Sequence, residues 1–371
     1  MPMINPGARQ RGFSLIELMV GVVIGLLTVL VITQVMTLAE GKKRTVSMGS
    51  DAQVNGALAL FTIQRDIQQA GYGAAASPDA LGCKVNYKFT SGSANSFTLA
   101  PVVITDGGTA SDSITVLQAN TTGFSAPMLM TGASTQTDDH FTMASTLGTA
   151  VDNLMIAVPQ TQDASHACTL FAVTSSGAST SLLSSTNLPH ATGSTGNSGW
   201  NASSVMPASG YPSNSYVLNM GAMLLRTYAV SATGNLTSGD LSLTTGTVPT
   251  PPPDLYPQIV MLRAMYGQAT TGTGTIDTYT KTSPTTNAGW KQVMAIRVAV
   301  VARSNQYEKD IVTSTVPQWD VGPNFTIAGT TSCNGSSKCL ALDVSTLADW
   351  QHYRYKVYDT IIPLRNVLWN S

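Results

Sequence analysis

The stretch Arg11-Gly12-Phe13-Ser14-Leu15-Ile16-Glu17-Leu18-Met19-Val20 opens the most apolar segment of the chain, which continues to Ala39. Glu17 is the only charged residue between Phe13 and Ala39. About 20 consecutive apolar residues are enough for a helix to cross a lipid bilayer. The segment therefore predicts one transmembrane helix over residues 13–39.

The order of charges and small residues around this helix is unlike that of a secretory signal. A secretory signal has its small-residue cleavage site after the apolar stretch, whereas Gly12 comes before it. Arg9 and Arg11 favour a cytoplasmic N-terminus, and the cluster Lys42-Lys43-Arg44 weakens that bias. Cleavage after Gly12 would leave the apolar helix on the mature protein.

The stretch resembles the processing motif of type IV prepilins, which belong to the type IV pilin-like superfamily. The resemblance implies that prepilin peptidase cuts after Gly12 and methylates the new amino terminus at Phe13. Residues 1–12 are then the leader. The same superfamily includes the pseudopilins of secretion systems, and the motif does not separate the two groups.

Glu17 has a physical reason to be functional. A carboxylate in a membrane helix is costly and usually has a partner, and the natural partner is an amino terminus at Phe13 on the same or a neighbouring subunit. This attraction is weakly screened in lipid, and the resemblance implies that it sets the axial register during assembly. Alternatively, Glu17 lies at the membrane interface with its carboxylate among the headgroups.

Gly21 and Gly25 have the spacing of a small-xxx-small pair, which lets membrane helices approach each other closely. Ordinary tolerance of glycine in membrane helices explains the pair equally well. Both interpretations stay open.

The helix is expected to continue beyond the membrane, because no proline occurs from Phe13 to Ser77. An apolar stripe with helical spacing follows Lys43. Its members are Val54, Ala57, Leu58 and Phe61, continued by Leu60, Ile63, Ile67 and Ala70. We expect one helix over residues 13–72, ended by Gly71-Tyr72-Gly73, with this stripe packed on a β-sheet.

After the helix, short apolar runs alternate with Gly, Ser, Thr, Asn and Pro, a pattern typical of β-strands. The fold class predicted is α+β, a pilin-like long helix on an antiparallel sheet. Residues 73–371 are expected to form a β-rich head outside the membrane, with an insertion over residues 119–255. Strands are expected at residues 84–89, 96–104, 113–118, 154–158, 169–173, 216–219, 223–230, 258–266, 293–302 and 353–362.

Three further segments resemble the PilW family of minor pilins. They are the helix end at residues 61–73, the strand at residues 295–304 and the C-terminal segment at residues 353–366. The middle of the chain carries no such resemblance. Within residues 295–304 and 353–362 the alternation of apolar and polar residues indicates half-buried strands. Arg65-Asp66 is expected to be a solvated pair or a contact between helix and sheet, with a contact to another subunit as the alternative.

Four cysteines fit two disulfides in an oxidising compartment, although the sequence alone leaves three pairings open. The five residues between Cys333 and Cys339 include an Asn-Gly turn, which favours a tight disulfide-closed loop. By elimination, Cys83 would then pair with Cys168.

Composition and motifs exclude several classes of function. Only 11% of the 371 residues are charged, and no Lys or Arg occurs between Lys88 and Arg226, which argues against binding of nucleic acid. The sequence has no Gly-x-Ser-x-Gly motif, no P-loop and no His-Glu-x-x-His spacing. We therefore expect no catalytic residues, no cofactor and no metal.

The hypothesis from these observations is a minor pilin of a type IV pilus, active in pilus assembly or initiation, in a tip or priming complex. Its expected partners are prepilin peptidase, other minor pilins, the major pilin, the inner-membrane assembly platform and a large tip adhesin. It is expected to cross the bacterial inner membrane once, with a periplasmic C-terminus, before it enters the pilus. The alternatives are a minor pseudopilin of type II secretion, or a tip adhesin using the Ser/Thr-rich middle. An exposed groove or an aromatic patch near Trp200 or Tyr211 would support the adhesin.

Overall fold

The structure is a computed structural model of the chain. It describes residues 12–90, 92–121, 126–162, 167–175, 182–192, 199–272, 274–323, 327 and 329–368. The chain divides into two compact units, residues 1–51 and residues 52–371. The second unit is called the head below.

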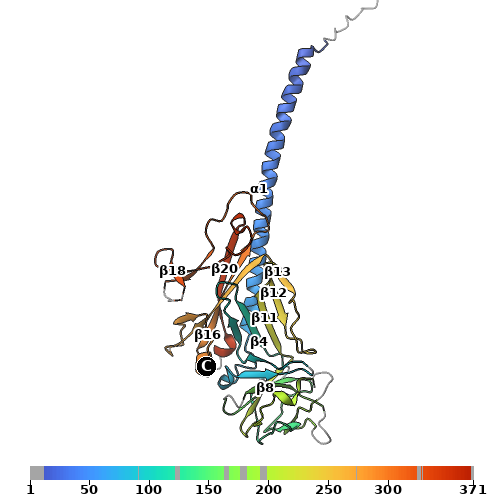
Figure 1. The fold of residues 1–371 in the computed structure, drawn as a ribbon, viewed down its shortest axis with the longest axis vertical. Coiled ribbons are helices and arrows are strands. Elements are labelled where there is room, and N and C mark those ends of the chain that lie inside the picture. Colours follow the sequence, from blue (N-terminus) through green and yellow to red (C-terminus); the bar gives the residue numbers. More distant parts are fainter. Residues whose placement is uncertain are drawn as a thin grey trace, which may run out of the picture. The chain divides into compact units, whose positions relative to one another are not determined.

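One long helix, α1 (Leu15–Gln69), begins in the first unit and ends in the head (Figure 1). Gly71 follows it with a φ of +79°, a left-handed conformation that glycine adopts without strain and that commonly ends helices. Asn366, near the C-terminus, donates its side-chain amide to the carbonyl oxygens of Gln69 (3.2 Å) and Ala70 (2.9 Å). Helix ends leave carbonyl groups without partners inside the helix, so Asn366 fixes the C-terminal segment to the end of α1.

The face of α1 that packs on the head differs from the predicted stripe. Val54, Leu58 and Phe61 are 52%, 45% and 61% exposed. The buried face carries mostly smaller residues, namely Ala52, Gly56, Ala59, Ile63, Ile67 and Ala70. A Cβ at position 56 would lie 2.5 Å from the ring of Tyr358, so the helix backbone approaches the sheet where only glycine fits. The prediction was right for Ile63, Ile67 and Ala70, and the half-buried Leu60 also packs against the core. It was wrong for Val54, Ala57, Leu58 and Phe61, because close approach selects the small-residue face.

Two antiparallel sheets pack against the head part of α1. Their strand orders are β13-β12-β11-β4-β3 and β15-β14-β16-β20. The strands are β3 (Val102–Thr105), β4 (Ser113–Gln118), β11 (Leu224–Val230), β12 (Asn235–Asp240), β13 (Asp254–Pro257), β14 (Ile259–Gln268), β15 (Thr278–Thr280), β16 (Val293–Arg303) and β20 (Tyr355–Pro363). Ile63 of α1, Tyr228 of β11 and Ile296 of β16 belong to one buried cluster, so helix and sheets share the main core.

A third sheet, with the strand order β2-β1-β8-β7-β10-β5, contains most of the middle of the chain. Its strands are β1 (Lys84–Tyr87), β2 (Asn95–Thr98), β5 (Met128–Leu129), β7 (Leu154–Val158), β8 (Cys168–Ala172) and β10 (Tyr216–Gly221). β1 and β8 run parallel, and the other pairs are antiparallel. Ile156 and its neighbour Met155 belong to different hydrophobic clusters, so both faces of this sheet are covered.

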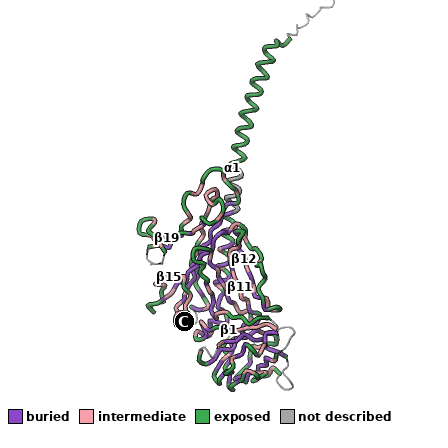
Figure 2. Tube along the Cα trace, viewed as in Figure 1, coloured by how far each residue is buried: buried purple, intermediate pink, exposed green. Residues whose placement is uncertain are grey.

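Smaller elements complete the head. They are the sheet β17-β19-β18 (Gln318–Gly322, Lys338–Ala341, Thr330–Ser332), the pair β6-β9 (His140–Thr142, Asn187–Pro189), and the short helices α2 (Asn287–Lys291) and α3 (Arg365–Leu368). Figure 2 shows that buried residues gather in the head, whereas the first part of α1 is exposed along its length. The observed elements confirm the predicted α+β class.

Candidate functional site

Gly12 and Phe13 precede the first turn of α1 and have no helical hydrogen bonds. A Cβ added at Gly12 would meet nothing within 4 Å, and Phe13 is 89% exposed. The peptide bond between them is therefore accessible, as cleavage by a peptidase requires. Arg9 and Arg11 lie outside the described residues.

Glu17 lies in the first turn of α1, where its side chain acts as a cap. Its Oε2 accepts a hydrogen bond from the backbone N–H of Ser14 at 3.1 Å. The Ser14 hydroxyl in turn accepts from the N–H of Ile16 at 3.4 Å, and the Ser14 carbonyl accepts the first helical bond from Leu18 at 3.2 Å. These contacts resemble a capping box, which places negative charge at the positive end of the helix. The carboxylate thus lies one residue away from the amine that cleavage would create at Phe13.

The apolar part of α1 is long enough to cross a membrane. Residues Leu15–Gly41 form a span of 27 residues with a mean hydropathy of 2.8, and none of its most apolar window is buried. Gly21 and Gly25 have no atom within 4 Å of an added Cβ, so both leave their helix faces open. Thr28 donates its hydroxyl to the carbonyl of Gly25 at 2.8 Å, which satisfies a polar group inside the span.

In the head, a group of charged residues ties α1 to the sheet of β11. Asp66 is 3% exposed and accepts hydrogen bonds from Arg226 (2.8 Å) and from the hydroxyl of Tyr228 (2.6 Å). Arg226 also forms two bonds of 2.7 Å with Asp240 on β12. The bonds to Asp240, and after them the bond to Asp66, raise the pKa of Arg226 against burial, which lowers it. Burial raises the pKa of Tyr228. Of the sequence pair Arg65-Asp66, only Asp66 points into the protein, since the side chain of Arg65 is 59% exposed.

Both disulfides are present in the structure. Cys83, next to β1, is bonded to Cys168 of β8, and Cys333 is bonded to Cys339 of β19. This is the pairing that the sequence favoured. Asp320 lies close to the second disulfide, but thiols held in a disulfide do not provide thiolate ligands, so this group does not offer a zinc site.

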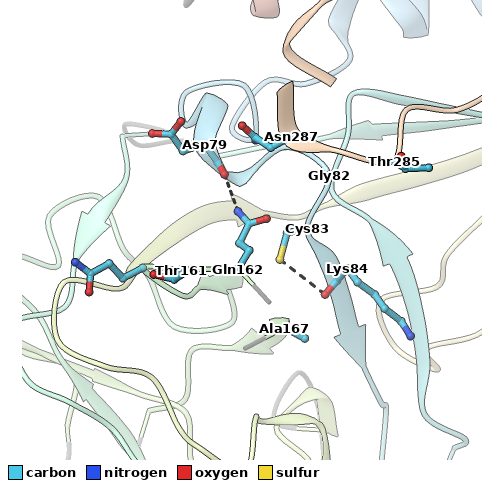
Figure 3. Close-up of a pocket in the computed structure, with 10 residues that line it drawn as sticks. Asp79, Gly82, Cys83, Lys84, Thr161, Gln162, Ala167, Thr285 and Asn287 are labelled. Carbon is cyan, nitrogen blue, oxygen red and sulfur yellow. Dashed lines mark hydrogen bonds between the residues drawn. The ribbon is translucent and has the colours of Figure 1, made fainter. Parts of the chain in front are cut away.

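A polar cavity of about 590 Å³ lies beside the disulfide of Cys83 (Figure 3). Its lining carries amide, hydroxyl and charged groups, among them Asp79, Lys84, Gln162 and Asn287. Gln162 donates its side-chain amide to the backbone carbonyl of Asp79 at 2.6 Å. The Asp79 carboxylate is paired with Lys291 at 2.5 Å. The described lining therefore contains polar binding groups without a nucleophile paired to a base.

The aromatic side chains that were expected to mark a binding surface lie in the core. Trp200 and Tyr211 are 0% and 1% exposed, so the expectation of an aromatic patch near them was wrong. The Trp200 indole donates to the carbonyl of Leu243 at 2.9 Å, and the Tyr211 hydroxyl donates to the hydroxyl of Thr169 at 2.8 Å. Both side chains fill hydrophobic clusters on the third sheet, which explains their burial.

Comparisons with known families match both ends of the chain. The family described as Type IV Pilus-assembly protein W (PilW) matches residues 227–366, and the Prokaryotic N-terminal methylation motif matches residues 7–33. Together these matches support a type IV pilin of the PilW type. The two matches support a minor pilin of a type IV pilus, a class of structural protein rather than of enzyme. The motif and the apolar helix are consistent with membrane anchoring and with processing by a peptidase.

Other comparisons add little about this pilin. No curated protein matches the chain. Among solved structures, a type IV-like pilin from Thermus thermophilus matches with 10% identity and a TM-score of 0.34, over 85% of this chain and 96% of that one.

Two details of the site, the cap formed by Glu17 and the partner of Asp66, were not predicted from the sequence. The capping role of Glu17 toward Ser14 has the Ser-x-x-Glu spacing as its signal. The bond from Asp66 to Arg226 joins residues 160 positions apart. Its only local signal is the place of Asp66 on the same helix face as Ile63 and Ala70.

Proposed function

We propose that this pilin takes part in the initiation of type IV pilus assembly, in a tip or priming complex, after prepilin peptidase has cut behind Gly12. The observation that carries the proposal is the N-terminal segment. An exposed glycine directly precedes a capped helix start and an unburied apolar span of 27 residues. This segment matches the methylation motif, which secretion pseudopilins share, and the PilW match favours a pilus over a secretion system.

The mechanism is non-catalytic. The span anchors the subunit in the inner membrane as a single pass, with its C-terminus in the periplasm. Cleavage exposes an amine at Phe13, and the Glu17 carboxylate attracts an amine of the same or a neighbouring subunit. Apolar contacts between helices then replace contacts with lipid, and Gly21 and Gly25 lie on open helix surface where such packing can occur.

The outward face of α1 in the head supports this role. Val54, Leu58 and Phe61 recur at helical spacing, and each is about half exposed or more. Exposed large apolar side chains that gather on one face indicate a surface for another protein. We propose that this exposed stripe packs against helices of neighbouring subunits, such as other minor pilins or the major pilin.

The division of the chain is also a proposal. We propose a leader at residues 1–12, a membrane span at residues 13–39, the complete N-terminal helix at residues 13–72 and the β-rich part of the head at residues 73–371. The insertion expected at residues 119–255 is better supported over residues 119–223. β11, β12 and β13 join β4 in one sheet and lie within or next to the PilW match, whereas the preceding strands β5, β7, β8 and β10 join the third sheet.

The test of this proposal uses Glu17. In cells that make pili, Glu17→Ala is expected to be cleaved normally and to be absent from sheared filaments, because the register contact is lost. Glu40→Ala, which removes an exposed acidic residue from the same helix, is the matched control and is expected to enter filaments. Normal incorporation of Glu17→Ala would contradict the proposal. Wild-type protein that is processed but confined to the envelope would favour a pseudopilin or a periplasmic assembly factor.

A further inference from the structure

The outer edge of β20 differs from the other sheet edges of the described head. β20 has nine residues, whereas the edge strands β2 and β13 have four, β15 has three and β5 has two. At β3 the edge is covered by side chains. The N–H of Ile104 donates to the Tyr266 hydroxyl at 2.6 Å, and the Ser283 hydroxyl donates to the Ile104 carbonyl at 2.9 Å.

Two contacts show which backbone groups of β20 face outward. Leu364, just after the strand, donates its N–H to Met294 at 2.9 Å, and Arg354, just before it, accepts from the N–H of Ser304 at 2.8 Å. Backbone groups in an antiparallel strand alternate between the two neighbours. The even-numbered residues of β20 therefore bond to β16, and the odd-numbered residues Tyr355, Val357, Asp359 and Ile361 direct their N–H and C=O groups outward.

These outward groups have no hydrogen-bond partner among the described residues. The chain just before β20 is covered, because Glu308 donates its N–H to the carbonyl of His352 (2.9 Å) and Val312 donates to that of Gln351 (3.0 Å). At the other end, Pro363 has no N–H to offer. The backbone groups without partners therefore extend from Tyr355 to Ile361, a stretch of β20 that is called the window below.

We propose that this open edge of β20 binds an extended segment of a neighbouring pilus subunit as an added strand. A row of alternating N–H and C=O groups at strand spacing is complementary to another extended backbone. The proposal rests on the proposed function, which places other subunits next to this one.

The side chains along the window define the chemistry of that segment. Lys356 is exposed, and the carboxylate of Asp359 is already held by Arg297 (3.3 Å) and by the Trp319 indole (3.1 Å). The unpaired charge of the edge is therefore positive and favours an acidic residue opposite Lys356. Ile361 is 48% exposed and favours an apolar neighbour on the other face of the added strand.

Photo-crosslinking in cells that make pili tests the pairing directly. The probe p-benzoylphenylalanine is placed singly at Lys356 and at Ile361, and at the exposed Leu147 as a control. The expected crosslinks from the two edge positions fall on one segment of one partner chain, about five residues apart, because paired strands advance together. Leu147 is expected not to capture that segment. Crosslinks that scatter over unrelated sites, or none at both edge positions, would overturn the proposal.

A matched pair of substitutions provides the second test. The N–H of Ile361 points away from β16, so Ile361→Pro removes an outward donor and leaves the bonds to β16 in place. Compared with Ile361→Thr, which keeps the N–H, the proline variant is expected to be about five- to tenfold less abundant in sheared filaments. Equal unfolding midpoints of the two purified full-length variants exclude a folding defect. Equal incorporation of well-folded variants would refute strand addition while leaving the pilus role intact, and absence of the wild type from filaments would instead refute the pilus role.

Discussion

Gly12 combines a small side chain with an open environment. Because nothing lies within 4 Å of an added Cβ, Gly12→Val does not disturb the subunit itself. It is expected to block cleavage, since only a very small residue fits beside the bond that the peptidase cuts. Intact mass measurement of the membrane fraction distinguishes the uncut from the processed chain.

Gly25→Val is the matched control for that variant. Gly25 also has no atom within 4 Å of an added Cβ but lies inside the span, away from the cleaved bond. It is expected to be processed like the wild type. Normal processing of Gly12→Val would count against the leader assignment.

His190 makes the stability of the head depend on pH. Its ring lies 4.1 Å from that of Phe141 and 5.6 Å from that of Phe171, and its Nε2 has no hydrogen-bond partner. Burial lowers the pKa of His190 to about 4, against an ordinary value of 6.5, although a backbone hydrogen bond and the nearby Asp139 favour the charged ring. The folded state therefore favours the neutral ring. The stability that this provides is complete above pH 6.5 and is lost as the pH falls toward 4.

The measurement compares the free energy of unfolding of the wild type with that of His190→Phe. Between pH 7 and pH 5 the wild type is expected to lose about 2 kcal/mol more than the variant, because only the wild type gains a proton there on unfolding. Other titrating groups cancel in the difference. If the free energy of unfolding changes equally with pH in both proteins, His190 is not the group that makes stability depend on pH.

At the scale of elements, α1 in the head has a small-residue face toward the sheets and a large-residue face toward solvent. Gly56→Leu is expected to lower the free energy of unfolding by about 1–3 kcal/mol, since its side chain collides with Tyr358 and the Cβ of Ala302. Ala57→Leu, one residue away on the exposed face, is expected to have little effect. Denaturant unfolding of both full-length variants in detergent measures the difference, and similar midpoints would mean that the helix does not pack this closely.

The outward face of α1 is expected to matter for assembly and not for folding. Phe61→Ser removes a side chain that is 61% exposed, so the unfolding midpoint is expected to change little. Its amount in sheared filaments is expected to fall several-fold, because apolar contact with a neighbouring helix is lost. Arg65→Ser changes an exposed side chain close by on the same helix and serves as the control. Equal amounts of both variants in filaments would show that the exposed stripe is not part of the assembly surface.

Strands with strong apolar patterns could be predicted from the sequence. Strands that lack such a pattern and form by pairing with other strands could not. β4 and β7 have the predicted bounds. The predicted strand at residues 96–104 is two strands in different sheets, because Pro101 lacks the N–H needed to continue one ladder. β12 was not predicted, because its sequence Asn-Leu-Thr-Ser-Gly-Asp is mostly polar and lacks an apolar alternation. It forms by pairing with its neighbours along the chain, β11 and β13.

At the scale of the whole chain, the segments that carry the family resemblance meet in one core. β16 and β20 pack against α1 around Gly56, and Asn366 binds the end of that helix. The bond from Asp66 to Arg226 adds a charged contact within the same core. The processing motif and the helix could be predicted from the sequence because the motif is local and the helix has a periodic pattern. The contacts between the end of the helix and the sheets could not be predicted, since they depend on residues about 160 to 300 positions away.

A disulfide links the middle of the chain to the segment that follows α1. The disulfide of Cys83 and Cys168 links the segment after α1 to β8 of the third sheet. No resemblance extends over this sheet, and its largest aromatic side chains are buried, so its outer surface is where any individual binding property of this pilin has to be sought.

The central claim is that a processed form of this chain is built into type IV pili. The most direct test is quantitative mass spectrometry of sheared, purified filaments, including the N-terminal peptide. We predict trace amounts relative to the major pilin, with a peptide that begins at a methylated Phe13. Absence from filaments, or an N-terminus that still carries residues 1–12 there, would contradict the claim.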